Sequence, residues 1–428
     1  MNGLIIFGLL VVLMLTGMPV SISLGLTVLT FIFAFTDVPV ASVALKLFTG
    51  IEKFEIMAIP FFILAGNFLT HGGVARRMIN FASAMVGHWH GGLGLAGVLA
   101  CALFAAVSGS SPATVVAIGS ILLPAMIKAG FPTRFGAGII TTSGALGILI
   151  PPSIVMVMYS VSTNTSVGAL FMAGVIPGLA LAFLLGFTTW WRARKFDYPR
   201  LPKASMATRL RTLRESIWGL MLIIIVMGGI YTGLFTPTEA AAMSAVYAFI
   251  IAVFVYKDMG LKDVPRVLLS SANMSAMLLY IITNAVLFSF VLANENIPQQ
   301  LADWLVGMGL GPIAFLLVCN VLLLVAGNFM EPSSIVLIMA PILFPVAVKL
   351  GIDPVHFGIL IVVNMEVGMC HPPVGLNLYV ASGITKMGIT ELTIAVWPWL
   401  LTMLGFLVLV TYWPTMSLWL PRMMGMIS

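Results

Sequence analysis

One uncharged stretch constrains this chain more than any other feature of its sequence. Between Arg134 and Arg192 the chain contains no Asp, Glu, Lys or Arg. About 18 apolar residues already suffice to cross the hydrocarbon core of a bilayer, so this stretch is long enough for more than one crossing. Hydrophobic residues make up 61% of the chain and charged residues 8%, where a soluble protein carries about 25% charged residues. The sequence therefore predicts an all-α protein that crosses the membrane many times, and it excludes a soluble fold and a single anchor.

The positive charges of the chain are concentrated in one segment. Eight of the 20 Lys and Arg residues fall within residues 192–214, namely Arg192, Arg194, Lys195, Arg200, Lys203, Arg209, Arg211 and Arg214. Such a cluster beside membrane spans is typical of a cytoplasmic loop that fixes the orientation of the protein. We expect residues 192–214 to be a basic cytoplasmic linker, with binding of nucleic acid or anionic lipid as the alternative.

Prolines and glycines recur along the chain at one long spacing. Four pairs of landmarks share the same offset: Pro124 and Pro345, Gly130 and Gly351, Pro151-Pro152 and Pro372-Pro373, and Pro177 and Pro398. The common offset predicts two structural repeats, residues 1–191 and 215–428, on either side of the linker. Many secondary transporters are built from such repeats in inverted orientation, with the substrate site where broken helices of the two halves meet. A passive ion channel, which also uses re-entrant segments, is the less favoured alternative.

Each half contains two apolar pieces that are too short to cross the bilayer alone. They flank the polar runs SGSSP, residues 108–112, and GNFMEPSS, residues 327–334. A piece of 14 to 16 residues spans roughly 20–24 Å, which is less than the ~30 Å hydrocarbon core. We therefore expect two re-entrant helical hairpins, over residues 92–130 and 310–350, whose tips end inside the membrane.

Each half also contains a helix that consecutive prolines must interrupt, over residues 134–163 and residues 354–383. Proline removes an N–H donor and clashes with the preceding turn, so carbonyl groups lose their helical partners. Inside a bilayer this is tolerated where the groups line a cavity or bind something. Freed carbonyls suit a hard cation such as sodium, and helix N-termini suit a carboxylate. A simple kink, or small residues that merely allow close helix packing, is the alternative.

Several further features complete the expectation. Residues 39–55 and, more weakly, 258–270 are amphipathic and predict helices on the membrane surface. Residues 1–36 contain a Gly-Met-Pro break and form either one kinked span or two pieces. Residues 236–239, TPTE, predict a capped helix start. Glu331 and Glu366 lie in apolar surroundings, where an acidic residue is costly enough to indicate function. The sequence lacks H-E-x-x-H, G-x-S-x-G and the phosphate-binding P-loop motif, so we expect no enzyme and no ATP-driven pump.

Four stretches together resemble the large membrane subunit of the tripartite ATP-independent periplasmic (TRAP) transporters. They are SGSSPATVVAIGSILLPAMIKAGF, GALGILIPPSI, GIYTGLFTPTEAAA and HPPVGLNLYVASG. The resemblance covers nearly the whole chain, with several motifs in the right order. It implies sodium-driven uptake of an organic acid, sialic acid or a C4-dicarboxylate, across a bacterial inner membrane. It also implies an elevator movement braced by surface arm helices.

The resemblance further implies partners and site residues. The partners are a small four-helix membrane subunit and a soluble periplasmic substrate-binding protein, both expected as separate chains. No cofactor is implied, and sodium is the coupling ion. The sodium ions are expected at Ser108, Gly109, Ser111, Gly147, Gly327, Gly368 and Cys370, largely through backbone carbonyls. The organic acid is expected at Ser108, Ser110, Ser153, Asn328 and Glu331. A stand-alone elevator-type transporter that needs no binding protein is the alternative function.

Overall fold

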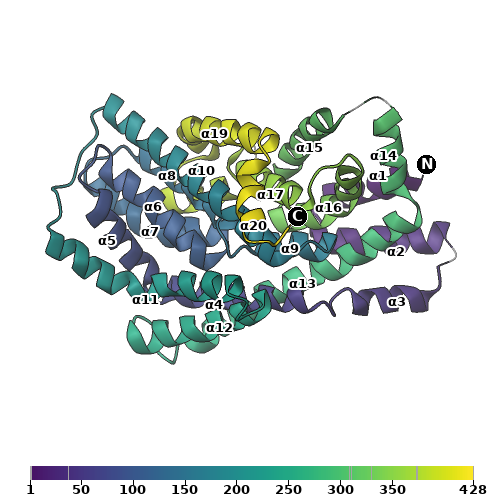
Figure 1. The fold of residues 1–428 in the computed structure, drawn as a ribbon, viewed down its shortest axis with the longest axis horizontal. Coiled ribbons are helices and arrows are strands. Elements are labelled where there is room, and N and C mark those ends of the chain that lie inside the picture. Colours follow the sequence, from purple (N-terminus) through teal and green to yellow (C-terminus); the bar gives the residue numbers. More distant parts are fainter. Residues whose placement is uncertain are drawn as a thin grey trace.

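The computed structural model describes residues 2–36, 38–307, 309, 311–328, 330–372 and 375–427, and these residues form helices and connections without a strand (Figure 1). Eight helical segments of the described part are long and apolar enough to cross a membrane. The predicted all-α, multi-pass architecture is therefore confirmed. Large apolar side chains such as Phe183 and Leu234 remain 72% and 74% exposed, as expected for surfaces that face lipid.

The helices follow one another with short connections. The first half contains α1 (Asn2–Leu15), α2 (Val20–Phe35), α3 (Val40–Thr49), η1 (Phe54–Met57), α4 (Ala58–His71), α5 (Val74–Val86), α6 (Gly92–Ser108), α7 (Ser111–Lys128), α8 (Thr133–Gly144), η2 (Ala145–Ile148), α9 (Ile154–Thr163) and α10 (Val167–Lys195). The second half contains α11 (Met206–Tyr231), α12 (Pro237–Ile250), the π-helical turn η3 (Ile251–Val255), α13 (Val264–Asn294), α14 (Ile297–Gly307), α15 (Pro312–Gly327), α16 (Pro332–Lys349), α17 (Pro354–Cys370), α18 (Leu376–Thr385), α19 (Ile389–Tyr412) and α20 (Thr415–Met423).

The helix bounds repeat with the spacing of the prolines. Helix α7 begins at Ser111 and α16 at Pro332, and both are 18 residues long. Helix α8 begins at Thr133 and α17 at Pro354, and the same offset separates these two starts. In Figure 1 the pair α6–α7 lies in the left half and the pair α15–α16 in the right half, with α17 and α20 near the centre. The inverted orientation of the two halves stays a prediction.

The N-terminal segment forms two helices, and the first amphipathic segment forms one. Residues 2–35 form two helices, because Gly17 adopts a φ of +84° and Pro19 stands two residues later, directly before α2. The first amphipathic segment is helical over residues 40–49, which is shorter than the expected 39–55. Thr236 and Glu239 form the expected reciprocal cap at the start of α12.

Two expected boundaries differ from the structure. Residues 258–270 are not a separate surface helix, because α13 begins at Val264 with Pro265 in its first turn and continues unbroken to Asn294. The linker 192–214 is largely helical, since α10 ends at Lys195 and α11 begins at Met206. The sequence also did not predict α5 and α14. Both carry polar residues that interrupt an apolar run.

The interior joins elements from both halves of the sequence. Helix α4 packs against α12, α8 against α19, and α9 against α16. Trp399 of α19, one of the largest fully buried side chains, donates its Nε1–H to Thr189 Oγ1 of α10 at 2.9 Å. The broken helices α8–η2–α9 and α17–α18 are thus held from both halves.

Candidate functional site

The first tip joins α6 to α7 through a tight turn. Helix α6 ends at Ser108, and Gly109 follows with a φ of +61°, a conformation that favours glycine. Ser108 Oγ lies 3.0 Å from Thr114 Oγ1, which donates to the carbonyl of Ser110 at 2.9 Å. The turn is therefore tied to the first turn of α7 by hydroxyl groups. Thr114 is a residue of the tip to which the sequence had assigned no role.

The first tip packs directly against the first broken helix. A Cβ atom added to Gly147 of η2 would lie 2.6 Å from the carbonyl oxygen of Ser110. A Cβ atom on Gly109 would lie 2.8 Å from the carbonyl oxygen of Pro152. Ser153 donates its hydroxyl to the carbonyl of Ile148 at 2.6 Å and caps α9. The main chain of the first tip contacts the main chain of the first broken helix at both glycines, and only glycine permits so close an approach.

The second tip meets the second broken helix in the same way. Gly327 ends α15, and a Cβ atom on it would lie 3.0 Å from the Cα atom of Gly368 in α17. Asn328 Oδ1 accepts a hydrogen bond of 3.0 Å from Nδ1 of His371. His371 had no assigned role, although its place beside Pro372 marked the break. Three residues of the second tip and the second break, namely Phe329, Pro373 and Val374, lie outside the described residues.

One asparagine connects the second half of the chain to the first tip. Asn377 of α18 donates its side-chain amide to Ser111 Oγ at 2.7 Å and to the carbonyl of Thr141 at 3.3 Å. The thiol of Cys370 donates to the same carbonyl at 3.4 Å. All four residues are fully buried. Ser111 and Cys370, both predicted at the cation sites, therefore share one cluster of polar atoms.

The predicted substrate residues fall into two groups. Ser108, Ser110 and Ser153 lie at the first tip and the start of α9, and Asn328 and Glu331 lie at the second tip. Glu331 is half-buried at the N-terminus of α16. Among the described residues, no hydrogen bond connects the Glu331 or Asn328 side chain to the three serines.

Glu366 is the most unusual charged residue of the interior. It is fully buried, and neither carboxylate oxygen has a hydrogen-bond partner among the described residues. It lies one helical turn before Cys370 on α17. On a different face of the same helix, Asn364 donates to Asn320 Oδ1 of α15 at 3.0 Å, and Asn320 donates to Thr411 Oγ1 of α19 at 2.8 Å. Buried polar groups thus continue from the broken region along α17.

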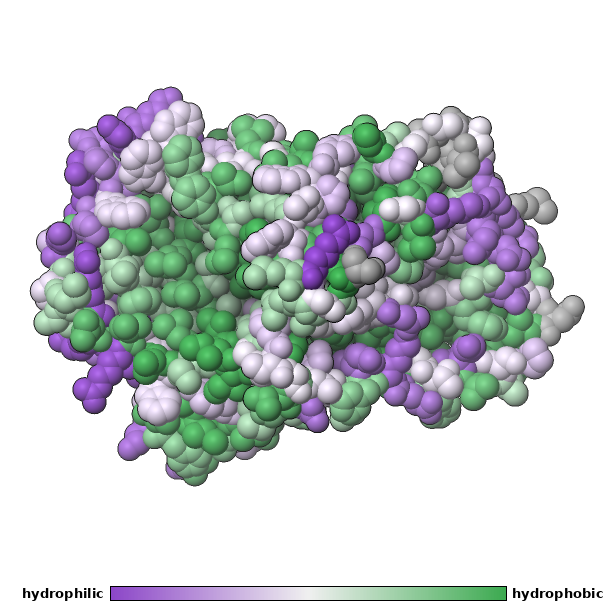
Figure 2. Space-filling view, in the orientation of Figure 1, coloured by the Kyte–Doolittle hydropathy of each residue, from purple (hydrophilic) through white to green (hydrophobic). Residues whose placement is uncertain are grey.

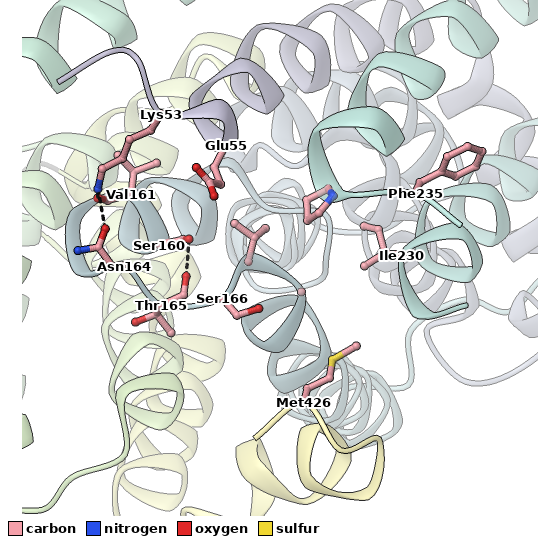
Figure 3. Close-up of a pocket in the computed structure, with 13 residues that line it drawn as sticks. Lys53, Glu55, Ser160, Val161, Asn164, Thr165, Ser166, Ile230, Phe235 and Met426 are labelled. Atoms are coloured by element: carbon pink, nitrogen blue, oxygen red, sulfur yellow. Dashed lines mark hydrogen bonds between the residues drawn. The ribbon is translucent and has the colours of Figure 1, made fainter. Parts of the chain in front are cut away.

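A polar cavity of about 570 Å³ lies where α9 ends and α10 begins (Figure 3). Lys53, from the connection between α3 and η1, donates to the carbonyl of Val161 at 2.6 Å and to Asn164 Oδ1 at 2.8 Å. Partial burial lowers the pKa of Lys53, against the raising influence of Glu55. Figure 3 shows Lys53 and Asn164 on one side of the cavity and Ile230 and Phe235 on the other. The cavity is thus bordered by the connection between α3 and η1, by the end of α9 and by α11.

The two tips, each packed against an interrupted helix within a bundle of apolar helices, place the chain in the class of multi-pass membrane transport proteins. The sequence profile of the tripartite ATP-independent periplasmic transporter, DctM component, matches residues 7–416. The chain belongs to this family, which confirms the resemblance drawn from its motifs.

Relatives agree with this assignment, and a solved structure shares the fold. The chain is 78% identical over 440 residues to the C4-dicarboxylate TRAP transporter large permease protein DctM of Rhodobacter capsulatus, with 100% of each chain covered. It is 37% identical to the sialic acid TRAP transporter large permease protein SiaM of Vibrio cholerae, with 96% of each chain covered. The YdaH transporter of Alcanivorax borkumensis has a similar fold, with a TM-score of 0.64 at 18% identity over 90% of this chain and 88% of that one.

Proposed function

We propose that this chain is the large subunit of a TRAP transporter that takes up a C4-dicarboxylate across the bacterial inner membrane, driven by inward sodium. The observation that carries the substrate class is the 78% identity, over both full chains, to a C4-dicarboxylate permease. Two further permeases with that substrate in their names are 55% and 48% identical. The sialic acid permease is 37% identical. Sequence similarity therefore favours a dicarboxylate over sialic acid.

Sodium coupling is supported by the chemistry of the two tips. Helix ends inside a membrane protein leave carbonyl oxygens without helical partners, and such oxygens suit a hard cation. At the first tip the hydroxyls of Ser108 and Thr114 lie close together beside the carbonyl of Ser110, which accepts from Thr114, so several oxygen atoms are concentrated there. At the second tip Gly327 and Gly368 bring two backbones into contact. We assign the coupling ions to these two places.

The organic acid requires hydrogen-bond donors and N-terminal helix dipoles. Helices α7, α9 and α16 begin at Ser111, Ile154 and Pro332, at the tips or breaks, and each directs its N-terminal end toward that region. Ser153 and the first-tip serines are candidate donors to one carboxylate. Glu331 cannot pair with a carboxylate unless a proton or a cation lies between them. We therefore assign Glu331 to a hydroxyl group of the cargo or to a coupling cation.

The transport cycle is proposed to move both tips against a scaffold. The amphipathic helix α3 is suited to lie along the membrane surface and brace the moving part. Lys53, which follows α3, already contacts the end of α9. A small membrane subunit and a soluble binding protein complete the proposed system, the latter delivering the cargo. The loop between α10 and α11 is assigned to the cytoplasm because of its basic residues.

The test is reconstitution into proteoliposomes. With the small subunit and the binding protein present, an inward sodium gradient should drive accumulation of labelled succinate, and excess sialic acid should not compete. Uptake that persists without sodium would contradict the coupling. Uptake that needs neither partner would favour the stand-alone transporter, and conductance in planar bilayers would favour a channel.

A further inference from the structure

An apolar groove runs along the outside of α10. It has a volume of about 400 Å³ and lies between α10, α6 and the connection that follows α5. Its lining is almost wholly hydrophobic, with Leu179, Phe183, Phe187 and Trp190 along one side and Trp89 opposite. Gly186 leaves the groove open, because the nearest atom to a Cβ added there would be Leu95 Cδ2 at 3.9 Å. Figure 2 shows a broad hydrophobic area in the left half of the molecule, where Figure 1 places α5 and α6.

The length of the groove matches half of a bilayer. Leu179 and Trp190 are eleven residues apart, which is roughly 17 Å along a helix. The hydrocarbon core is about 30 Å thick, so the groove has about the depth of one leaflet. Both tryptophans of the lining, Trp89 and Trp190, precede basic or histidine residues at one end. Tryptophan is enriched at the boundary between hydrocarbon and headgroups, so this end corresponds to the headgroup level.

A cationic side chain lies at that same end. The guanidinium of Arg194 lies 5.5 Å from the centre of the Trp190 ring, and its side chain is exposed. The following segment continues the positive charge with Lys195, and the only acidic residue within 192–214 is Asp197. An anionic group with several acceptor oxygens complements this end of the groove.

We propose that the groove binds an acyl chain of an anionic phospholipid, whose phosphate is held by Arg194. The hydrophobic walls account for the chain, and the charge at one end accounts for the headgroup. A free phosphate would leave the apolar part of the groove without an occupant. This site is separate from the two tips, and it does not depend on the identity of the transported acid.

The experiment uses the full chain, purified in detergent and depleted of lipid. Phosphatidylglycerol or phosphatidylcholine with the same acyl chains is added, and the midpoint of thermal unfolding is followed against lipid concentration. Phosphatidylglycerol should raise the midpoint at lower concentration than phosphatidylcholine. In Arg194→Gln the half-saturating concentration of phosphatidylglycerol should rise about fivefold, the effect of one basic residue at a lipid surface. Arg214→Gln, in the same basic segment, is the matched control and should leave it unchanged.

A second variant tests the groove itself. Gly186→Leu places a side chain in the groove, where its Cβ atom would meet nothing closer than 3.9 Å, and it should abolish most of the stabilisation by either lipid. If Gly186→Leu does not fold, Phe183→Ala is tested instead. Native mass spectrometry then counts the phospholipids that remain bound to the wild-type chain and to Phe183→Ala, and fewer are expected on Phe183→Ala. Equal effects of the two lipids on the wild type, or full stabilisation of Gly186→Leu, would overturn the proposal. If the small membrane subunit displaces the lipid and Gly186→Leu loses that subunit, the groove is a protein interface instead.

Discussion

The contact between Gly147 and the first tip yields a sharp prediction. In Gly147→Ala the new Cβ atom would lie 2.6 Å from the carbonyl oxygen of Ser110 and 2.8 Å from the Cα atom of Ser111. Ordinary contact at such a position begins at 3.4 Å, so the tip must retreat by the difference, about 0.8 Å. Overpacking of this kind typically costs about 1–3 kcal/mol of stability.

The displacement also reaches the predicted cation site. Asn377 Nδ2 lies 2.7 Å from Ser111 Oγ, and a retreat of about 0.8 Å would stretch this contact to the limit of a hydrogen bond. We therefore expect Gly147→Ala to unfold at a lower temperature and to need more sodium for half-maximal uptake of succinate in proteoliposomes. Membrane insertion should be retained, because the change adds one apolar methyl group.

The control is Gly383→Ala in α18, where an added Cβ atom meets nothing within 4 Å. This change should be neutral, or stabilising by up to about 1 kcal/mol, because alanine favours the helix. If Gly147→Ala has both the unfolding temperature and the sodium dependence of the wild type, the first tip does not pack against η2 as described.

Three further predictions concern other contacts. Asn377→Ala removes the buried hydrogen bonds of its side chain with Ser111 and with the carbonyl of Thr141, and it should lower the free energy of unfolding by about 1–3 kcal/mol, measured by thermal unfolding in detergent; an unchanged free energy of unfolding would contradict it. Glu331→Ala should abolish succinate uptake at unchanged membrane content, and normal uptake would remove the second tip from the proposed site. Partial burial raises the pKa of Asp258, but Arg77 and Arg76 outweigh this and lower it. The ion pairs therefore stabilise the fold above the unfolded pKa of about 4, and this stability is lost as pH falls through the folded pKa. Unfolding temperatures of Asp258→Asn should approach those of the wild type at low pH; an equal difference at every pH would refute this.

The sequence predicted the bounds of the helix pairs α6–α7 and α15–α16 to within a few residues because polar runs and prolines mark their ends; that the pairs are re-entrant stays a prediction. Helix α7 had been expected from about residue 113 and begins at Ser111. Helices α5 and α14 were not predicted because their polar residues, such as Arg76 and Asp303, interrupt the apolar run by which a span is identified. The division of α13 was an error of the opposite kind, since nothing between Ser270 and Ala272 interrupts a helix.

The candidate site was predictable in its parts and not in its assembly. The common spacing of prolines and glycines indicated that Gly147 and Gly368 belong to corresponding breaks. A periodic pattern does not specify which side chain of one half contacts the other half. The bond from Asn377 to Ser111 joins residues 266 positions apart, and only the tertiary packing of α18 on α7 brings them together.

That bond sets an order of events during biosynthesis. The ribosome has already delivered α6, α7 and α8 to the membrane when the codon for Asn377 is still far downstream. Until α18 is inserted, the hydroxyl of Ser111 and the carbonyl of Thr141 must form hydrogen bonds with water or with other nearby groups. The first tip therefore acquires its final hydrogen bonds only when α18 has been inserted, and a nascent chain cut short before residue 377 would carry both helices of the first pair without the partner of Ser111.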